Sequence, residues 1–116
     1  MKIKEIGMIL SADILTKTAD TEREVYAACG SDMMSDVLAY VKNQGVLLTG
    51  LNNLQVIRTA QMMDMLCVVF VRGKIPSQQI IDLAEEHNIA VIATGKTMFI
   101  ACDMLYLNGL REQDNE

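Results

Sequence analysis

Four glycines recur along this chain at nearly equal intervals, and each one follows an apolar run and precedes a stretch with helical periodicity. They are Gly30, Gly50, Gly73 and Gly95, and they stand 20, 23 and 22 residues apart. An apolar run, a glycine and then an amphipathic segment are typical of a β-strand that turns into an α-helix. The repeat therefore predicts successive βα units, whose right-handed crossovers build a parallel sheet.

The same patterns predict the individual elements. Strands are expected over 24–29, 46–49, 66–71 and 89–93, and helices over 33–44, 53–64, 77–87 and 98–107. Before residue 18, outside the repeat, we expect a short helix over 3–10 and an extended piece over 12–16. Pro76 is expected in the first turn of its helix, where a missing N–H is harmless. The prediction is an α/β fold, a small layered sandwich with a mainly parallel sheet of four to five strands, in one domain over residues 1–116.

Composition excludes several classes of partner. The 10 basic residues are scattered and outnumbered by 15 acidic ones, which gives a net charge of −5 and argues against binding to nucleic acid. No apolar run approaches the roughly 18 residues that span a bilayer, and the start of the chain lacks the features of a signal peptide. The three cysteines form no CxxC pair, which suits free thiols in a reducing compartment. We therefore expect a cytoplasmic protein that binds neither nucleic acid nor membrane.

The glycine turns also predict where a ligand would bind. In a parallel sheet the carboxyl ends of the strands share one edge, where helix N-termini offer unpaired N–H groups. The candidate ligand-binding residues at this edge are Gly30, Ser31, Asp32, Thr49, Gly50, Asn52, Asn53, Arg72, Gly73, Lys74, Thr94, Gly95, Lys96 and Thr97. Three of them are cations, which suits a phosphate or a carboxylate. The same residue types are also what βα turns need for geometry alone, so a purely structural role stays open.

Known nucleotide and metal motifs are absent from these turns. Thr94-Gly95-Lys96-Thr97 resembles the end of a P-loop, but the position of the first glycine of that motif is Ala90, inside the expected strand. Residues 28–33 contain no GxGxxG pattern. His87 is the only histidine, and no second ligand stands at metal-binding spacing from it. We expect neither a metal nor a cofactor.

No catalytic constellation is visible in the sequence. A cysteine nucleophile needs a base nearby, and the only histidine is expected at the opposite edge of the sheet. Cys29 precedes a helix start and is either a reactive thiol or a small buried hydrophobe. A small transferase or phosphatase that uses Asp32 with Ser31 or Cys29 is the remaining enzymatic alternative. The expectation is a non-enzyme with no catalytic residues.

Methionine is abundant, with nine in 116 residues. Such flexible side chains either fill the core or provide an adaptable surface for self-association. A small sheet with open edges also benefits from a partner. We therefore predict a homodimer.

Two segments resemble the DRTGG domain family. They are Val25-Tyr26-Ala27-Ala28-Cys29-Gly30-Ser31-Asp32-Met33-Met34-Ser35-Asp36-Val37-Leu38 and Val69-Phe70-Val71-Arg72-Gly73-Lys74-Ile75-Pro76. Where the family tends to show Thr-Gly-Gly, this chain reads Arg72-Gly73-Lys74 and keeps only the middle glycine. The resemblance covers almost the whole chain and implies a small α/β module, found alone or joined to CBS domains and phosphate acetyltransferases, with a regulatory or ligand-sensing role.

The resemblance and the turns together suggest two functions. The first is a non-catalytic regulatory module that binds an adenine nucleotide or another small anion at the strand edge, with Arg72, Lys74 and Lys96 as counter-charges. The second follows from the resemblance, because similar stand-alone members accompany iron-only hydrogenases and electron-transfer proteins. In that alternative the chain is an interaction subunit that docks a larger enzyme.

Overall fold

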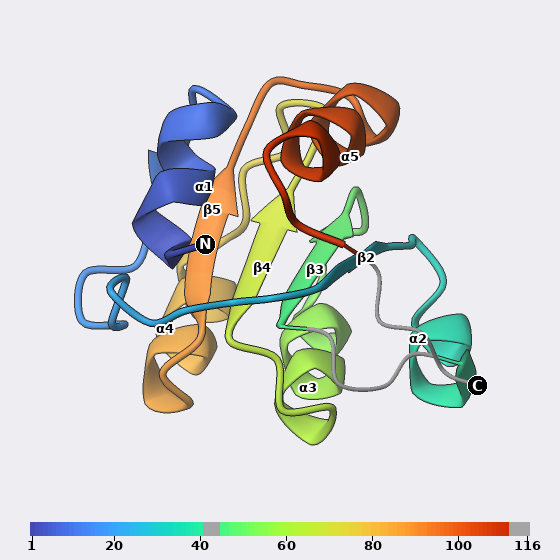
Figure 1. Cartoon of the computed structure of the whole chain (residues 1–116). Coiled ribbons are helices and arrows are strands. Elements are labelled where there is room, and N and C mark those ends of the chain that lie inside the picture. The colour runs from blue at the N-terminus through green and yellow to red at the C-terminus, as the bar shows by residue number, and fades with distance from the viewer. Residues whose placement is uncertain (41–44, 112–116) are drawn as a thin grey trace.

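The computed structural model of the protein describes residues 1–40 and 45–111. Helices and strands alternate through most of this length (Figure 1). In chain order they are α1 (Ile3–Ile9), β1 (Asp13–Ile14), β2 (Ala28–Gly30), α2 (Met34–Tyr40), β3 (Val46–Thr49), α3 (Leu54–Met62), β4 (Cys67–Phe70), α4 (Gln78–Glu86), β5 (Ala90–Ala93) and α5 (Met98–Leu107).

One five-stranded sheet runs through the middle of the molecule, in the order β1-β5-β4-β3-β2. The four strands β2 to β5 are parallel neighbours, so consecutive strands lie side by side. β1 pairs antiparallel with β5, with Asp13 opposite Ala93. The prediction of an α/β fold with a mainly parallel sheet of four to five strands is confirmed.

The helices form a layer on each face of the sheet. Figure 1 shows α2, α3 and α4 on one side and α1 and α5 on the other. The first three connect strands that step in one direction across the sheet, and right-handed crossovers then place them all on the same face. α5 follows the last strand and returns over the opposite face, where it packs near β2 and β3. This return brings the end of the chain to the β2 edge.

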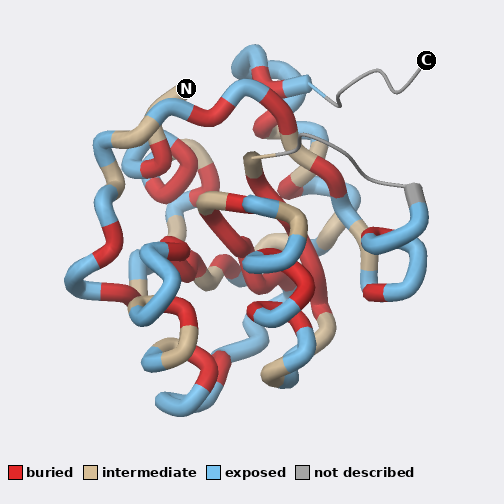
Figure 2. Tube along the Cα trace, turned by 90° about the horizontal axis from the view of Figure 1, so that it is seen from below, coloured by how far each residue is buried: buried red, intermediate tan, exposed pale blue. Residues whose placement is uncertain are grey.

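Alternating strand residues divide the core into two apolar clusters. Val46 and Leu48 of β3 face α1 and α5, while Leu47 faces the three crossover helices. Both β3 and β4 are buried along their whole length, as expected for central parallel strands that are covered on both faces. Figure 2 shows this burial concentrated inside the molecule, with exposed positions along the outer helices.

Most predicted elements differ from the structure by one or two residues at their ends, and three differences have a structural consequence. The strand expected over 24–29 is shorter, because only Ala28–Gly30 pair with β3. Glu24 instead forms an isolated bridge with Lys2, so this part of the chain crosses the N-terminus before it reaches the sheet. Pro76 lies before Ser77, the N-cap of α4, and so precedes the first turn. The helix expected over 33–44 begins at Met34, and its last four expected residues lie outside the described part.

None of the described helices combines the length and the apolar character that crossing a bilayer would require. The longest, α5, has 10 residues.

Candidate ligand site

The turns after β2, β3 and β4 meet at one edge of the sheet, as the repeat predicts. Asp32, which follows β2, places its carboxylate over the end of β3. There Oδ1 accepts hydrogen bonds from the Gly50 N–H at 2.6 Å and from the Thr49 hydroxyl at 3.3 Å. Oδ2 forms an ion pair with Nη2 of Arg72 at 3.5 Å. A single carboxylate therefore joins three turns that are far apart in the sequence.

Arg72 has an unusual backbone conformation at this edge. Its φ is 61° and that of the following Gly73 is 72°, so two consecutive residues are left-handed. This region favours glycine, and an arginine there raises the energy of the backbone. Two hydrogen bonds to the β5 turn hold the conformation, from Arg72 N–H to the Lys96 carbonyl at 2.7 Å and from Gly73 N–H to the Thr94 carbonyl at 3.0 Å. The β4 and β5 turns are thereby joined as well.

Gly50 leaves room for the Arg72 side chain. A Cβ at this glycine would come within 2.8 Å of Cζ of the guanidinium and would overlap its outer nitrogen. The guanidinium therefore lies directly across the Gly50 backbone on its way to Asp32. A side chain at position 50 would occupy the space of the guanidinium. The glycine is not needed for backbone conformation here, because its φ is not left-handed.

The ion pair changes the charge that the sequence predicts for this edge. Arg72 and Asp32 are each about half exposed and compensate each other. Among the described residues, neither Lys74 nor Lys96 forms an ion pair, and they are exposed and half-buried respectively. Of the three predicted counter-charges, the two lysines are the ones without a carboxylate partner in the described part of the chain.

Several other predicted site residues hold the backbone. Asn53 and Thr97 are N-caps, whose side chains accept hydrogen bonds from backbone N–H groups in the first turns of α3 and α5. The Asn52 amide donates to the carbonyl of Ile75 at 3.1 Å and so ties the β3 turn to the loop before α4. The Thr94 hydroxyl is buried and donates to the carbonyl of Leu10.

Four of the predicted site residues line a separate cavity. Thr94, Gly95, Lys96 and Thr97 surround a cavity of about 350 Å³ between the start of α5 and the end of α1. Gly95 is exposed there, and a Cβ at this position would meet no atom within 4 Å. Arg72, Asn52 and Asn53 do not line this cavity.

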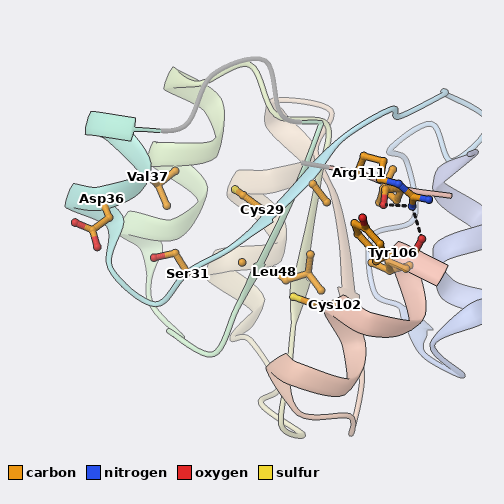
Figure 3. Close-up of a pocket in the computed structure, with 12 residues that line it drawn as sticks. Cys29, Ser31, Asp36, Val37, Leu48, Cys102, Tyr106 and Arg111 are labelled. Carbon is orange, nitrogen blue, oxygen red and sulfur yellow. Dashed lines mark hydrogen bonds between the residues drawn. The ribbon is translucent and has the colours of Figure 1, made fainter. Parts of the chain in front are cut away.

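A cavity of about 400 Å³ lies beside the edge strand β2, between α2 and α5 (Figure 3). Its volume falls within the range that small-molecule sites occupy. Its apolar lining comes from both faces of the sheet, with Val37 of α2 on one face and Leu48 of β3 and Leu105 of α5 on the other. Two predicted residues, Gly30 and Ser31, belong to its wall. The first βα turn therefore lines a cavity that the sequence did not delimit.

The two ends of this cavity carry opposite charges. Asp36, on α2, is exposed at one end, and Arg111 stands at the other. The Arg111 guanidinium lies over the Tyr106 ring, 4.0 Å from its centroid, and Nη1 donates to the carbonyls of Tyr106 and Leu110. The Arg111 carbonyl in turn accepts the Ala28 N–H at 2.8 Å. These contacts fix the arginine between α5 and the edge strand.

Sequence reasoning missed Tyr106 and Arg111. They follow the last glycine turn, and the strand that they approach lies more than 70 residues earlier in the chain. An Arg five residues after a Tyr is a weak local signal, because it does not say which strand the end of α5 approaches. Only the return of α5 across the sheet brings these side chains to β2.

The three cysteines are buried or half-buried. Cys29 is buried in β2 and lines the larger cavity, as does Cys102 of α5. Burial raises the pKa of Cys102, whose Sγ lies 3.7 Å from Sδ of Met98. Burial also raises the pKa of Cys67 in β4 to about 12. Within the described residues, no three His, Cys, Asp or Glu side chains gather in a way that would hold a metal ion.

Comparison with known proteins identifies the fold family. The DRTGG domain family matches residues 5–107. A similar solved structure contains the CBS and DRTGG domains of the regulatory region of Clostridium perfringens pyrophosphatase, complexed with its activator diadenosine tetraphosphate. The TM-score is 0.75 at 21% sequence identity, and the match covers 98% of this chain and 51% of the other. This chain therefore spans about half the length of that one.

No curated protein matches the chain in sequence. The family match nevertheless covers most of its length, and a solved structure that contains a DRTGG domain has a similar fold. The protein belongs to the DRTGG domain family.

Proposed function

We propose that this protein is a non-catalytic regulatory module that senses a small anionic ligand, with an adenine nucleotide as the preferred class. The observation that carries the proposal is the cavity beside β2, whose apolar lining separates Asp36 at one end from Arg111 at the other. The ligand-bound regulatory region of similar fold supports the nucleotide class, because that protein's activator is a dinucleotide.

The chemistry of the cavity suits the parts of a nucleotide. The apolar lining on the α5 side of the sheet, at Leu48 and Leu105, accepts a planar base. Asp36 accepts hydrogen bonds from an exocyclic amine or a ribose hydroxyl, while the Arg111 guanidinium pairs with a phosphate. In this proposal the ligand binds beside the edge strand β2 and not at the centre of the predicted strand edge. Gly30 and Ser31 belong to both the cavity and that edge.

The strand edge itself offers a competing position for the anion, next to Lys74 and Lys96. Substitutions separate the two placements. Arg111→Gln removes the cation of the cavity, whereas Lys96→Gln and Lys74→Gln remove cations of the strand edge. Titration calorimetry with ATP, AMP and a diadenosine polyphosphate measures the dissociation constant for each variant.

We expect Arg111→Gln to weaken binding at least tenfold, because a hydrogen bond to a charged group contributes about 1.5–3 kcal/mol. The two lysine variants should stay within about twofold of the native chain, since each removes only screened surface charge. The reverse pattern would place the ligand at the strand edge. If none of these compounds at a hundredfold excess over a micromolar dissociation constant stabilises the native chain by about 2.7 kcal/mol, the nucleotide class is wrong.

We further propose that the protein acts in the cytoplasm as a homodimer. The absence of a described helix suited to a bilayer is consistent with the first part. The interaction-subunit alternative, with a larger hydrogenase-related or electron-transfer enzyme as partner, predicts instead that a heterologous complex forms without any nucleotide. Co-purification from native cells, with and without added nucleotide, distinguishes these functions.

A further inference from the structure

Helix α5 is apolar on both of its faces. Its inner side, with Ala101 and Leu105, is buried against the sheet. Its outer side exposes Phe99 at 84% and Leu107 at 75% of their surface. A helix that is apolar all round is normally covered all round. The outer side of α5 is therefore expected to have a partner.

The exposed residues of α5 form one continuous stripe. Phe99, Ile100, Asp103, Tyr106 and Leu107 are exposed at positions i, i+1, i+4, i+7 and i+8, which share one side of a helix. We call these five residues the α5 stripe. Isolated exposed apolar side chains are ordinary, but a contiguous apolar patch marks an interaction site.

The charges around the stripe suit a second copy of the same chain. Asp103 is the only charged residue within α5, and the Arg111 guanidinium lies over the ring of Tyr106, one turn further along. If two α5 helices pair antiparallel about a two-fold axis near Met104 and Leu105, Asp103 of each copy faces the level of Tyr106 in the other. The carboxylate of each copy then meets the guanidinium of the other, twice in one interface.

We propose that the α5 stripe is a self-association surface that joins two copies of this chain through antiparallel α5 helices. Such an isologous contact uses the same patch on both copies and closes without leaving an open surface. The apolar side chains of Phe99, Ile100 and Leu107 flank the central charged residues, whose charges compensate in pairs. Two chains with a net charge of −5 each can therefore approach at this face. The inference rests on the proposed homodimer and gives it an interface. Tyr106 and Arg111 also line the cavity of the nucleotide proposal, whereas Leu107 does not, so a substitution of Leu107 separates association from ligand binding.

A matched pair of substitutions tests the proposal. Leu107 and Ile75 are equally exposed, at 75%, but Ile75 lies in the loop before α4 and outside the stripe. Leu107→Lys places a cation in the last turn of α5, where it is compatible with the helix dipole. Sedimentation velocity of the native chain should give a species of twice 12.9 kDa. Leu107→Lys should raise the dimer dissociation constant at least about tenfold, because the substitution removes a leucine from both copies of the symmetric interface. The control variant Ile75→Lys should leave the dissociation constant unchanged.

Charge reversal provides an independent test of the orientation. Asp103→Arg alone opposes two cations across the interface, and Arg111→Asp alone opposes two anions, so each should weaken the dimer. The double variant restores opposite charges and should recover most of the native dissociation constant. A parallel arrangement, or one that avoids these residues, predicts no such recovery.

Three results would overturn the proposal. One is a native chain that sediments as a single copy at tenth-millimolar concentration, which would assign the stripe to a different protein. Another is equal weakening by Leu107→Lys and Ile75→Lys. The third is a dimer that all of these substitutions leave intact, which would place the contact elsewhere. Circular dichroism of each variant confirms that a loss of association does not follow from a loss of folding.

Discussion

Replacing Asp32 tests whether one side chain holds the β2 and β3 turns together. In Asp32→Ala the Gly50 N–H and the Thr49 hydroxyl both lose their acceptor, and Thr49 and Gly50 are buried. In Asp32→Asn a carbonyl oxygen still accepts from Gly50, whereas the charge and the acceptor that face Arg72 are lost. The two variants therefore separate the hydrogen bonds from the ion pair with Arg72.

The hydrogen bonds and the ion pair of Asp32 should contribute different amounts to the free energy of unfolding. A hydrogen bond to a charged acceptor contributes about 1.5–3 kcal/mol, and the 2.6 Å distance to Gly50 belongs to the strong end. The ion pair is 3.5 Å long between half-exposed groups, so it contributes only about 0.2–1 kcal/mol. We expect Asp32→Ala to lower the free energy of unfolding by about 2 kcal/mol and Asp32→Asn by about 0.5 kcal/mol.

Urea denaturation followed by circular dichroism measures these changes. With a slope of about 1–3 kcal/mol per molar urea, the alanine variant shifts the midpoint by roughly 1 M. Asp36→Ala, an exposed carboxylate in the first turn of α2, is the control and should stay within about 0.5 kcal/mol. If Asp32→Ala and Asp32→Asn are equally destabilised, or if both match the control, the proposed link between the turns is refuted.

Three further predictions concern pH, backbone strain and the cavity. Burial raises the pKa of Cys67 from 9.0 to about 12, so the folded state holds this proton more tightly than the unfolded state. The free energy of unfolding should therefore keep its full value below pH 9 and fall as pH rises toward 12. Cys67→Ala should remove this fall, measured as the urea midpoint at each pH. Arg72→Gly should be more stable than Arg72→Ala by about 1 kcal/mol in the same assay, since only glycine relieves the left-handed φ of 61°; equal stabilities would show that the backbone there is not strained. A nucleotide bound beside β2 should slow alkylation of Cys102 by iodoacetamide, measured by peptide mass spectrometry, and an unchanged rate would place the ligand away from this thiol.

Local patterns were sufficient for most of the elements. The bounds of α5, 98–107, agree with the prediction, as do those of β3 at 46–49. Each of these segments combines an uninterrupted apolar run or an N-capping residue with a clear stop, so neighbours along the chain determine it. The strand expected over 24–29 starts too early, because the pairing of its residues depends on where β3 begins and where the N-terminus crosses.

In the candidate site, too, local patterns predicted the positions of the turns but not the contacts between them. The glycine spacing correctly placed the turns at one edge, but it could not tell which polar groups are already used. Asp32 is a candidate ligand-binding residue in the sequence, and in the structure it contacts the Gly50 N–H and the Arg72 guanidinium across the edge. That choice depends on a buried backbone donor in another turn, which no local pattern reveals.

The sequence by itself determined the βα order, the parallel sheet and the shared edge of the four glycine turns, because hydrophobic periodicity and turn residues act over a few neighbouring positions. The tertiary structure decided that Gly50 makes room for a guanidinium and that α5 returns over the sheet to place Tyr106 and Arg111 beside β2. It also left one apolar side of α5 uncovered. These features rest on contacts between residues far apart in the chain, which form only when the layers pack.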